Sequence, residues 1–435
     1  MNRYATISGW GMYVPDRIMT NHELSLMVDT SDEWIRSRTG IQQRHIVDAR
    51  EATSDLATRA GWAALHSADL GPEELDLVIV ATCSPDYHLP ATACLVQDRL
   101  GASRAGAFDV NAACSGFVYA LSMASSAIVS GAANKALVIG AEAITRWIDW
   151  TQRDTCVLFG DGAGAVVLEA TERPSGLLSY VLGSDGSGGE MLMMRNGGSR
   201  LPPKGNLPLD GGLNMNGKEV YRFATRIMGR AAREAITRAG LTPADIDLFI
   251  PHQANLRIIE SAARSLDVPM SKVFVNVQKY GNTSAASIPI AICEAANEGF
   301  LQPGQNVCLI GFGAGLTWAA ATLRWMPLRA RPSQSVPKRM VRWSRAPLAR
   351  VKSLVHRAER RMDGLEDEID RREWLRERLR RDEGAPDATP TVNGNGHGQS
   401  APKGHADSAS DRHAATAPDS RPDSATPPNG TDKAN

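Results

Sequence analysis

Through residue 327, short apolar runs alternate with longer Ala-rich stretches whose apolar positions recur at helical spacing. Leu77–Ile79 and Leu248–Ile250 lie in two of the short runs, each of which has the length of a buried strand. Strands that alternate with helices are typical of parallel pairing through right-handed crossovers. The pattern therefore predicts an α/β fold.

The same pattern contains an internal repeat. GPEELDLVIV begins at Gly71 and TPADIDLFIP at Thr242, an offset of 171 residues. Without a gap, this offset also places ALVIGAE, from Ala136, on VCLIGFG, from Val307. A register that survives several elements indicates a duplicated unit. We therefore predict two α/β halves, residues 1–173 and 174–327, stacked as a five-layer α/β/α/β/α body.

The composition changes abruptly at Met326-Pro327. The first part of the tail, residues 328–383, is strongly basic from Lys338 to Arg361 and then has apolar positions at helical spacing. This pattern predicts a charged amphipathic helix. Residues 384–435 are rich in Pro, Ser, Ala, Gly and Asp and have too few apolar residues for a core, so we predict disorder there.

The composition also narrows the setting in which the protein works. Lys plus Arg and Asp plus Glu each number 48, so the net charge does not indicate a nucleic-acid partner. The N-terminus lacks the layout of a signal peptide, and no apolar run approaches the roughly 20 residues of a membrane-spanning helix. Neither CxxC nor HExxH occurs among the motifs. We expect a soluble cytoplasmic protein with reduced thiols and no metal site.

Cys114 is the first candidate for chemistry. It lies in AFDVNAACSGFVYALSMASSAIVSGA, which reads as a strand followed by a long helix. A cysteine in the first turn of a helix meets unpaired backbone N–H groups and the positive end of the helix dipole, and both stabilise a thiolate. The alternative is a small buried core thiol, which is our interpretation of the other five cysteines. Those five are Cys83, Cys94, Cys156, Cys293 and Cys308.

The repeat supplies two partners for Cys114. Asn111 precedes Cys114 by three residues, and the offset places it on Asn282 in KYGNTSAAS. A pseudo-twofold axis would bring these two strand-to-helix turns together. His252, in LFIPHQAN, follows the strand Leu248–Ile250, where sites of open α/β sheets collect. Its polar neighbours predict an exposed turn and favour function over a structural role.

Cysteine, histidine and asparagine in this chain order also occur in papain-like proteases. That interpretation requires a secreted or lysosomal setting and a Cys-Trp signature beside the nucleophile, and neither is present. Hydrolysis is therefore disfavoured.

Six motifs in order resemble β-ketoacyl-acyl carrier protein synthase III, a condensing enzyme of the thiolase fold that begins type II fatty acid synthesis. They are DTSDEWIRSRTGI, AACSGF, FGDGAGAVVL, PHQANLRI, YGNTSAAS and GFGAGLTW, and the resemblance covers about residues 1–327. It implies that Cys114 accepts an acyl group from acyl-CoA. It also implies that His252 and Asn282 stabilise the enolate formed when malonyl-acyl carrier protein loses carbon dioxide. No cofactor is implied.

The resemblance also assigns binding residues. The backbone N–H groups of Cys114 and Ala314 would bind the acyl-thioester oxygen, with Ala314 at a position that is often glycine. Leu89 stands where members that use acetyl groups carry a phenylalanine that closes the acyl tunnel across a homodimer, so longer primers are expected. Trp34 and Arg153 would sandwich the adenine of CoA. Residues expected along the pantetheine and phosphate path are Thr30, Arg38 and Asn255, and those expected to dock the carrier protein are Arg222, Arg257 and Arg264.

Several alternatives stay open at this point. Relatives with the same triad prime specialised polyketides or lipids or transfer acyl groups to alcohols or amines, and scaffold subunits of paired ketosynthases lack the nucleophile. Asp154 replaces a usual glycine at the CoA entrance. The basic part of the tail is a solvated appendage, a weak contact for an anionic membrane surface, or an extra contact for the acidic carrier protein.

Overall fold

The computed structural model describes residues 2–195, 197–200 and 212–328, together with residues 351, 355 and 358. Its first sheet has the strand order β1-β7-β6-β4-β5, in which β4 runs parallel to β5 and β6. Strand β7 pairs antiparallel with both β6 and β1. The bounds are β1 Tyr4–Tyr13, β4 Leu77–Ala81, β5 Gly106–Val110, β6 Lys135–Glu142 and β7 Gly162–Thr171.

The second sheet repeats the first four strands in the same order, β8-β13-β12-β11. Strands β11 and β12 are parallel, and β13 pairs antiparallel with β12 and β8. The offset of 171 residues carries the first residue of β4 to that of β11 and the whole of β6 to the whole of β12. The bounds are β8 Gly176–Ser184, β11 Leu248–Pro251, β12 Asn306–Gly313 and β13 Thr317–Arg324.

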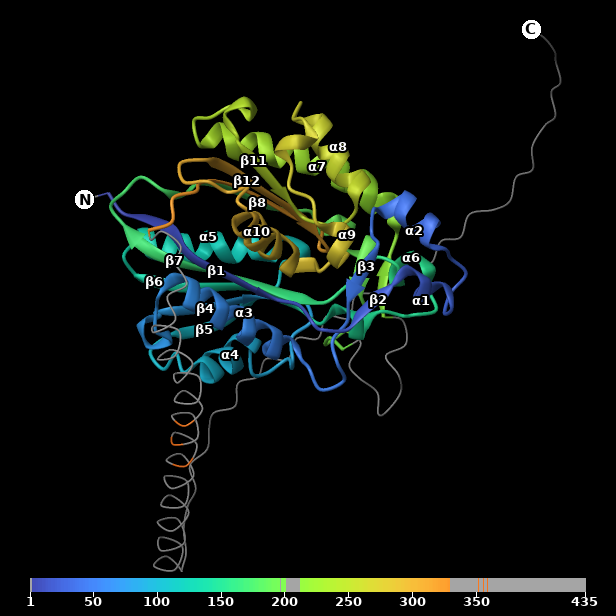
Figure 1. The fold of residues 1–435 in the computed structure, drawn as a ribbon, viewed down its shortest axis with the longest axis horizontal. Coiled ribbons are helices and arrows are strands. Elements are labelled where there is room, and N and C mark those ends of the chain that lie inside the picture. Colours follow the sequence, from blue (N-terminus) through green and yellow to red (C-terminus); the bar gives the residue numbers. More distant parts are fainter. Residues whose placement is uncertain are drawn as a thin grey trace, which may run out of the picture. The chain divides into compact units, whose positions relative to one another are not determined.

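Helices complete five layers, as predicted (Figure 1). Helices α5 (Gly116–Val129) and α10 (Ser287–Glu298) lie between the two sheets. Helices α3 (Thr53–Ala68) and α4 (Thr92–Leu100) cover the outer face of the first sheet. On the outer side of the second sheet, α7 (Gly217–Arg238) contacts β13, β12 and β8, and α8 (Leu256–Ser265) contacts α7.

The hydrophobic pattern explains which layer each helix occupies. Helix α5 is apolar nearly all round and is therefore buried between two sheets, whereas α7 has an apolar stripe and an arginine-rich exposed face. Glycines allow α10 to approach the first sheet closely. A Cβ atom at Gly140 would stand 2.2 Å from the carbonyl oxygen of Ala285, and one at Gly164 2.5 Å from the amide nitrogen of Ile290.

Shorter elements surround the edge of the sheets where the parallel strands end. Their bounds are β2 Ile18–Thr20, α1 Asn21–Ser25, α2 Asp32–Thr39, β3 Gln43–His45, α6 Arg153–Cys156, β9 Leu192–Met194, β10 Leu213–Met215 and α9 Val277–Tyr280. The expected boundary after residue 173 falls in the turn between β7 and β8 and stays a prediction.

The tail lies almost entirely outside the described residues. Of the segment 328–383, only residues 328, 351, 355 and 358 are described; Val351, Val355 and Ala358 are helical and exposed. The predicted disorder of residues 384–435 is outside the described chain. In the described part, no helix combines the length and the apolarity needed to cross a membrane.

Candidate active site

The site begins with two equivalent turns at the ends of the parallel strands. Ala113 and Ser284, which the offset of 171 residues relates, have φ angles of 47° and 48°. Asn111 Oδ1 accepts a hydrogen bond from the amide of Ala113, and Asn282 Oδ1 accepts one from the amide of Ser284. The turns meet where the thiol of Cys114 donates to Ser284 Oγ at 3.4 Å. The predicted approach of the two turns is present in the fold.

Cys114 differs from its prediction in one respect. It lies in a 3-10 turn, Ala113–Ser115, just before α5, and its side chain is buried. Burial raises the pKa of the Cys114 thiol to about 12; the hydrogen bond with Ser284 lowers it, and the negative charge of Glu142 raises it further. The expected stabilised thiolate is therefore wrong for this state, because desolvation outweighs the hydrogen bonding at the turn. Cys114 is a protonated thiol at neutral pH.

His252 also has surroundings that the sequence did not predict. The turn after β11 is buried, with His252 and Gln253 each 1% exposed, so the expected exposed turn is wrong. The polar side chain of Gln253 bonds inward, donating to the carbonyl oxygens of Pro251 and Phe274. Burial lowers the pKa of His252 to about 3, so its imidazole is neutral.

Neighbouring groups orient both His252 and Asn282 as donors. Ser287 Oγ accepts from the amide of Gln253 at 3.5 Å and lies 2.6 Å from His252 Nδ1. Its own proton therefore points to Nδ1, which leaves the imidazole proton on Nε2. Within the described chain, His252 Nε2 has no hydrogen-bond partner. Because Asn282 Oδ1 is occupied by the amide of Ser284, its Nδ2 is the side that can donate.

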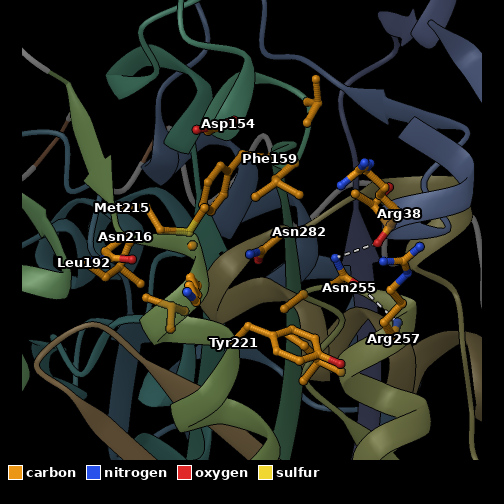
Figure 2. A pocket seen from close by; sticks show the side chains of 18 of the residues that line it. Arg38, Asp154, Phe159, Leu192, Met215, Asn216, Tyr221, Asn255, Arg257 and Asn282 are labelled. Carbon is orange, nitrogen blue, oxygen red and sulfur yellow. Dashed lines mark hydrogen bonds between the residues drawn. The ribbon is translucent and has the colours of Figure 1, made fainter. Parts of the chain in front are cut away.

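Cys114, His252 and Asn282 line one cavity of about 880 Å³. In the view of Figure 2, Arg38, Asn255 and Arg257 gather on one side and Leu192, Met215 and Asn216 on the other, with Asn282 between them. The structure therefore brings together residues that are far apart in the sequence. Other predicted residues that line this cavity are Trp34, Arg222 and Asp154.

Trp34 carries two guanidinium groups near its ring. The Cζ atoms of Arg38 and Arg153 lie 4.8 Å and 4.9 Å from the ring centroid. Arg153 donates to the carbonyl oxygen of Asp29 at 3.0 Å and lines a neighbouring hollow rather than the large cavity. Binding of an adenine between Trp34 and Arg153 would require Arg153 to move away from the ring.

The remaining predicted binding residues differ in position. Asn255 lines the cavity, but its side chain caps α8: Oδ1 accepts from the amide of Arg257, and Nδ2 donates to the carbonyl oxygen of Arg38. Thr30 lies outside the lining of the large cavity, and its Oγ1 atom is buried without a partner in the described chain. Arg264 is exposed on α8 and pairs with Glu260 at 4.0 Å.

A second cavity, of about 420 Å³, opens on the other side of Cys114. Ala314 lines it, and the adjacent Gly313 leaves the backbone beside Cys114 open, because a Cβ atom there would stand 2.6 Å from the Cys114 nitrogen. Most of its other walls are apolar. They include Ile144, Phe159, Leu192, Met193, Met194 and Leu213.

Leu89 lies in the loop between β4 and α4 with 87% of its surface exposed, and it lines neither cavity of its own chain. The edge strand β5 pairs only with β4 among the described strands, and its residues are exposed or half-buried.

Sequence reasoning missed three polar groups behind Cys114. Glu142, at the end of β6, is fully buried and accepts from Ser284 Oγ at 3.0 Å. Cys83, interpreted as a core thiol, is half-buried and lines the second cavity, and Cys94 is exposed. An acidic residue ending an apolar strand was the available signal for Glu142. In the described chain, no group of three His, Cys, Asp or Glu side chains could hold a metal.

Comparisons with known proteins support the family that the motifs indicate. Residues 108–186 match the family described as 3-Oxoacyl-[acyl-carrier-protein (ACP)] synthase III, and residues 236–325 match its C-terminal part. The β-ketoacyl-[acyl-carrier-protein] synthase III of Roseiflexus sp. (strain RS-1) is 52% identical over 327 residues, 75% of this chain and 99% of the relative. That of Caldanaerobacter subterraneus is 50% identical over 324 residues, 74% of this chain and 98% of the relative.

Solved structures agree with this result. The 3-oxoacyl-[acyl-carrier-protein] synthase III of Aquifex aeolicus is 48% identical with a TM-score of 0.70, covering 74% of this chain and 100% of its own. The priming β-ketosynthase of the R1128 polyketide pathway is 39% identical with a TM-score of 0.71, covering 75% of this chain and 97% of its own. The chain is thus a condensing enzyme of the thiolase fold, and it belongs to the β-ketoacyl-[acyl-carrier-protein] synthase III family.

Proposed function

We propose that this chain condenses an acyl-CoA primer with malonyl-[acyl-carrier protein] to begin fatty acid synthesis. Cys114 Sγ attacks the primer carbonyl carbon, and CoA leaves as the acyl group becomes a thioester of Cys114. The malonyl group loses carbon dioxide, and the resulting enolate carbon attacks that thioester to give 3-oxoacyl-[acyl-carrier protein]. The observation that carries the proposal is one cavity onto which a thiol, a neutral imidazole and an amide all face. No cofactor takes part.

His252 and Asn282 stabilise the decarboxylation step. Loss of carbon dioxide places negative charge on the malonyl thioester oxygen, and N–H donors fixed beforehand lower the energy of that oxyanion. His252 Nε2 and Asn282 Nδ2 are two such donors because Ser287 and the amide of Ser284 occupy the opposite atoms of each group. A base is not needed, since the departing carbon dioxide leaves the carbanion behind.

The acylation step uses a different set of donors. The thioester oxygen of the primer would bind the backbone N–H groups of Cys114 and Ala314, which border the second cavity together. That cavity is mostly apolar and suits the hydrocarbon chain of a primer longer than acetyl. The two cavities meet at Cys114, so CoA or the carrier arm enters through the larger and the acyl chain extends into the smaller.

The rim of the larger cavity fits both substrate carriers. Trp34 and Arg153 would hold the adenine of CoA, and Thr30, Arg38 and Asn255 would line the pantetheine and phosphate path. Arginines at the same rim would attract an acidic carrier protein. These are Arg222 and Arg257, with Arg264 farther along α8.

We also propose a cytoplasmic homodimer. The exposed edge of β5 can continue the sheet into a second copy, and unpaired edges favour such pairing. Leu89, which contacts neither cavity of its own chain, would then close the acyl cavity of the partner copy. A monomer that is active in light scattering at assay concentration would contradict this.

A second function is favoured by one observation. The priming β-ketosynthase of the R1128 polyketide pathway shares the fold, and the 420 Å³ apolar cavity suits long starters. Purified enzyme should be incubated with acetyl-CoA or longer acyl-CoA primers and with malonyl-[acyl-carrier protein] or malonyl-CoA. Carbon dioxide and 3-oxoacyl-[acyl-carrier protein] support condensation, whereas transfer of the acyl group to an alcohol or amine without carbon dioxide overturns it. A strict requirement for one specialised carrier protein supports the polyketide alternative.

A further inference from the structure

The acylation of Cys114 raises a question about its proton. Because burial raises the pKa of this thiol to about 12, almost none of it is ionised at neutral pH, and the proton has to leave as sulfur attacks. His252 is poorly suited to accept it. Its Nε2 atom already carries a proton, burial lowers its pKa to about 3, and the thiol donates to Ser284 instead.

Ser284 is held in place to receive this proton. The residue is 1% exposed, and its amide donates to Asn282 Oδ1 at 2.9 Å, which fixes the turn. Its hydroxyl accepts from Cys114 Sγ at 3.4 Å and donates to Glu142 Oε1 at 3.0 Å. The three side chains therefore form one directed chain of hydrogen bonds.

Glu142 is the end of that chain and has capacity for a proton. It is fully buried, and in the described chain its partners are neutral donors rather than a cation. Burial raises the pKa of this carboxyl group above its usual range, and its hydrogen bonds act in the opposite direction. The donors are Thr82 Oγ1, the amide and thiol of Cys83, the amide and hydroxyl of Ser84, Ser284 Oγ and the amide of Ala285.

We infer that Ser284 and Glu142 form a proton relay that activates Cys114. As the bond between Cys114 Sγ and the primer carbonyl carbon forms, the thiol proton passes to Ser284 Oγ and the serine proton passes to Glu142 Oε1. When the carbon–sulfur bond to CoA breaks, the protons return through Ser284 and one reaches the CoA sulfur. Glu142 ends ionised, and CoA leaves as a thiol.

This inference rests on the proposed function only for the identity of the acyl donor. The removal of the thiol proton can be measured with iodoacetamide, which needs neither CoA nor a carrier protein. If condensation fails in the wild type while the alkylation results hold, the proposed function is wrong and the relay stands. If condensation proceeds and the alkylation results fail, the relay alone is wrong.

Glu142→Gln separates a relay from a purely electrostatic role. The negative charge of Glu142 raises the pKa of Cys114, so loss of charge alone would make alkylation at pH 7 faster than in the wild type. Loss of a proton acceptor makes it slower, by about 100-fold, the usual contribution of a general base. Alkylation of Cys114 should be followed by peptide mass spectrometry from pH 6 to 10, and the gap should narrow as pH rises and hydroxide replaces the relay.

Ser284→Ala covers the case in which Glu142→Gln does not fold. The equivalent turn has an alanine, Ala113, at the same φ angle, so the substitution fits this backbone. A matched control is Ser122→Ala in α5, whose hydroxyl donates to the carbonyl oxygen of Tyr119 away from Cys114. It should leave alkylation unchanged.

In mixtures of H₂O and D₂O, the single-turnover acylation rate of the wild type should curve with the deuterium fraction, because two protons move together. In Ser284→Ala it should be linear and about 100-fold slower. Faster alkylation in Glu142→Gln, or a linear wild-type plot with an unchanged Ser284→Ala rate, overturns the relay.

Discussion

His252→Ala and Asn282→Ala should separate the two half-reactions. Each change removes one N–H donor from the decarboxylation site and leaves the hydrogen bond between Cys114 and Ser284 intact. Loss of a single oxyanion donor costs about 2.7–4 kcal/mol, which slows decarboxylation by about 10² to 10³. Acylation should stay within about threefold of the wild type because neither side chain receives the thiol proton.

The assay isolates each step. Enzyme is first loaded with primer, and the mass increase on Cys114 gives the acylation rate. Malonyl-[acyl-carrier protein] with a labelled carboxylate is then added, and released carbon dioxide gives the decarboxylation rate. If His252→Ala slows acylation as much as decarboxylation, the separation of roles is wrong, and His252 takes part in activating Cys114.

Three further predictions concern pH, primer length and the tail. The folded-state pKa of His252, about 3, lies below the unfolded value of about 6.5, so neutral His252 costs nothing above pH 6.5 and destabilises the fold increasingly as pH falls towards 3. His252→Gln should therefore lose less stability between pH 7 and 5 than the wild type in urea titrations; equal losses would contradict the low pKa. Leu89→Phe should shift the preference towards acetyl-CoA, and strict acetyl specificity in the wild type would contradict the gate. Truncation after Pro327 should leave acylation of Cys114 unchanged and, if the tail tethers, should raise the Michaelis constant for malonyl-[acyl-carrier protein] or abolish salt-sensitive binding to anionic vesicles; loss of the fold would show that the boundary is misplaced.

The fold could be predicted largely because the duplication is written in one offset. The offset that relates β4 to β11 also relates Ala113 to Ser284, two turns with the same backbone conformation. Sequence spacing alone therefore predicts that Asn282 lies opposite Cys114. A repeat supplies this information because pseudo-symmetry converts sequence spacing into spatial proximity.

The electrostatics of the site could not be predicted in the same way. Polar letters around His252 suggested exposure, yet Gln253 turns its amide inward to satisfy buried carbonyl groups. The pKa of Cys114 depends on how completely the second half of the chain covers it. Glu142 and Ser284 are 142 residues apart and meet only through packing. Local sequence predicts hydrogen-bonding capacity, whereas burial is a property of the assembled layers.

The central claim is that Cys114 carries the acyl group between two substrates. It is tested most directly by the intact and peptide mass of the enzyme after incubation with a mixed acyl-CoA pool. We predict one acyl adduct, on Cys114 alone, that persists in buffer and disappears when malonyl-[acyl-carrier protein] is added, with 3-oxoacyl-[acyl-carrier protein] as the product. An adduct on another residue, or none on Cys114 while condensation proceeds, would contradict the account.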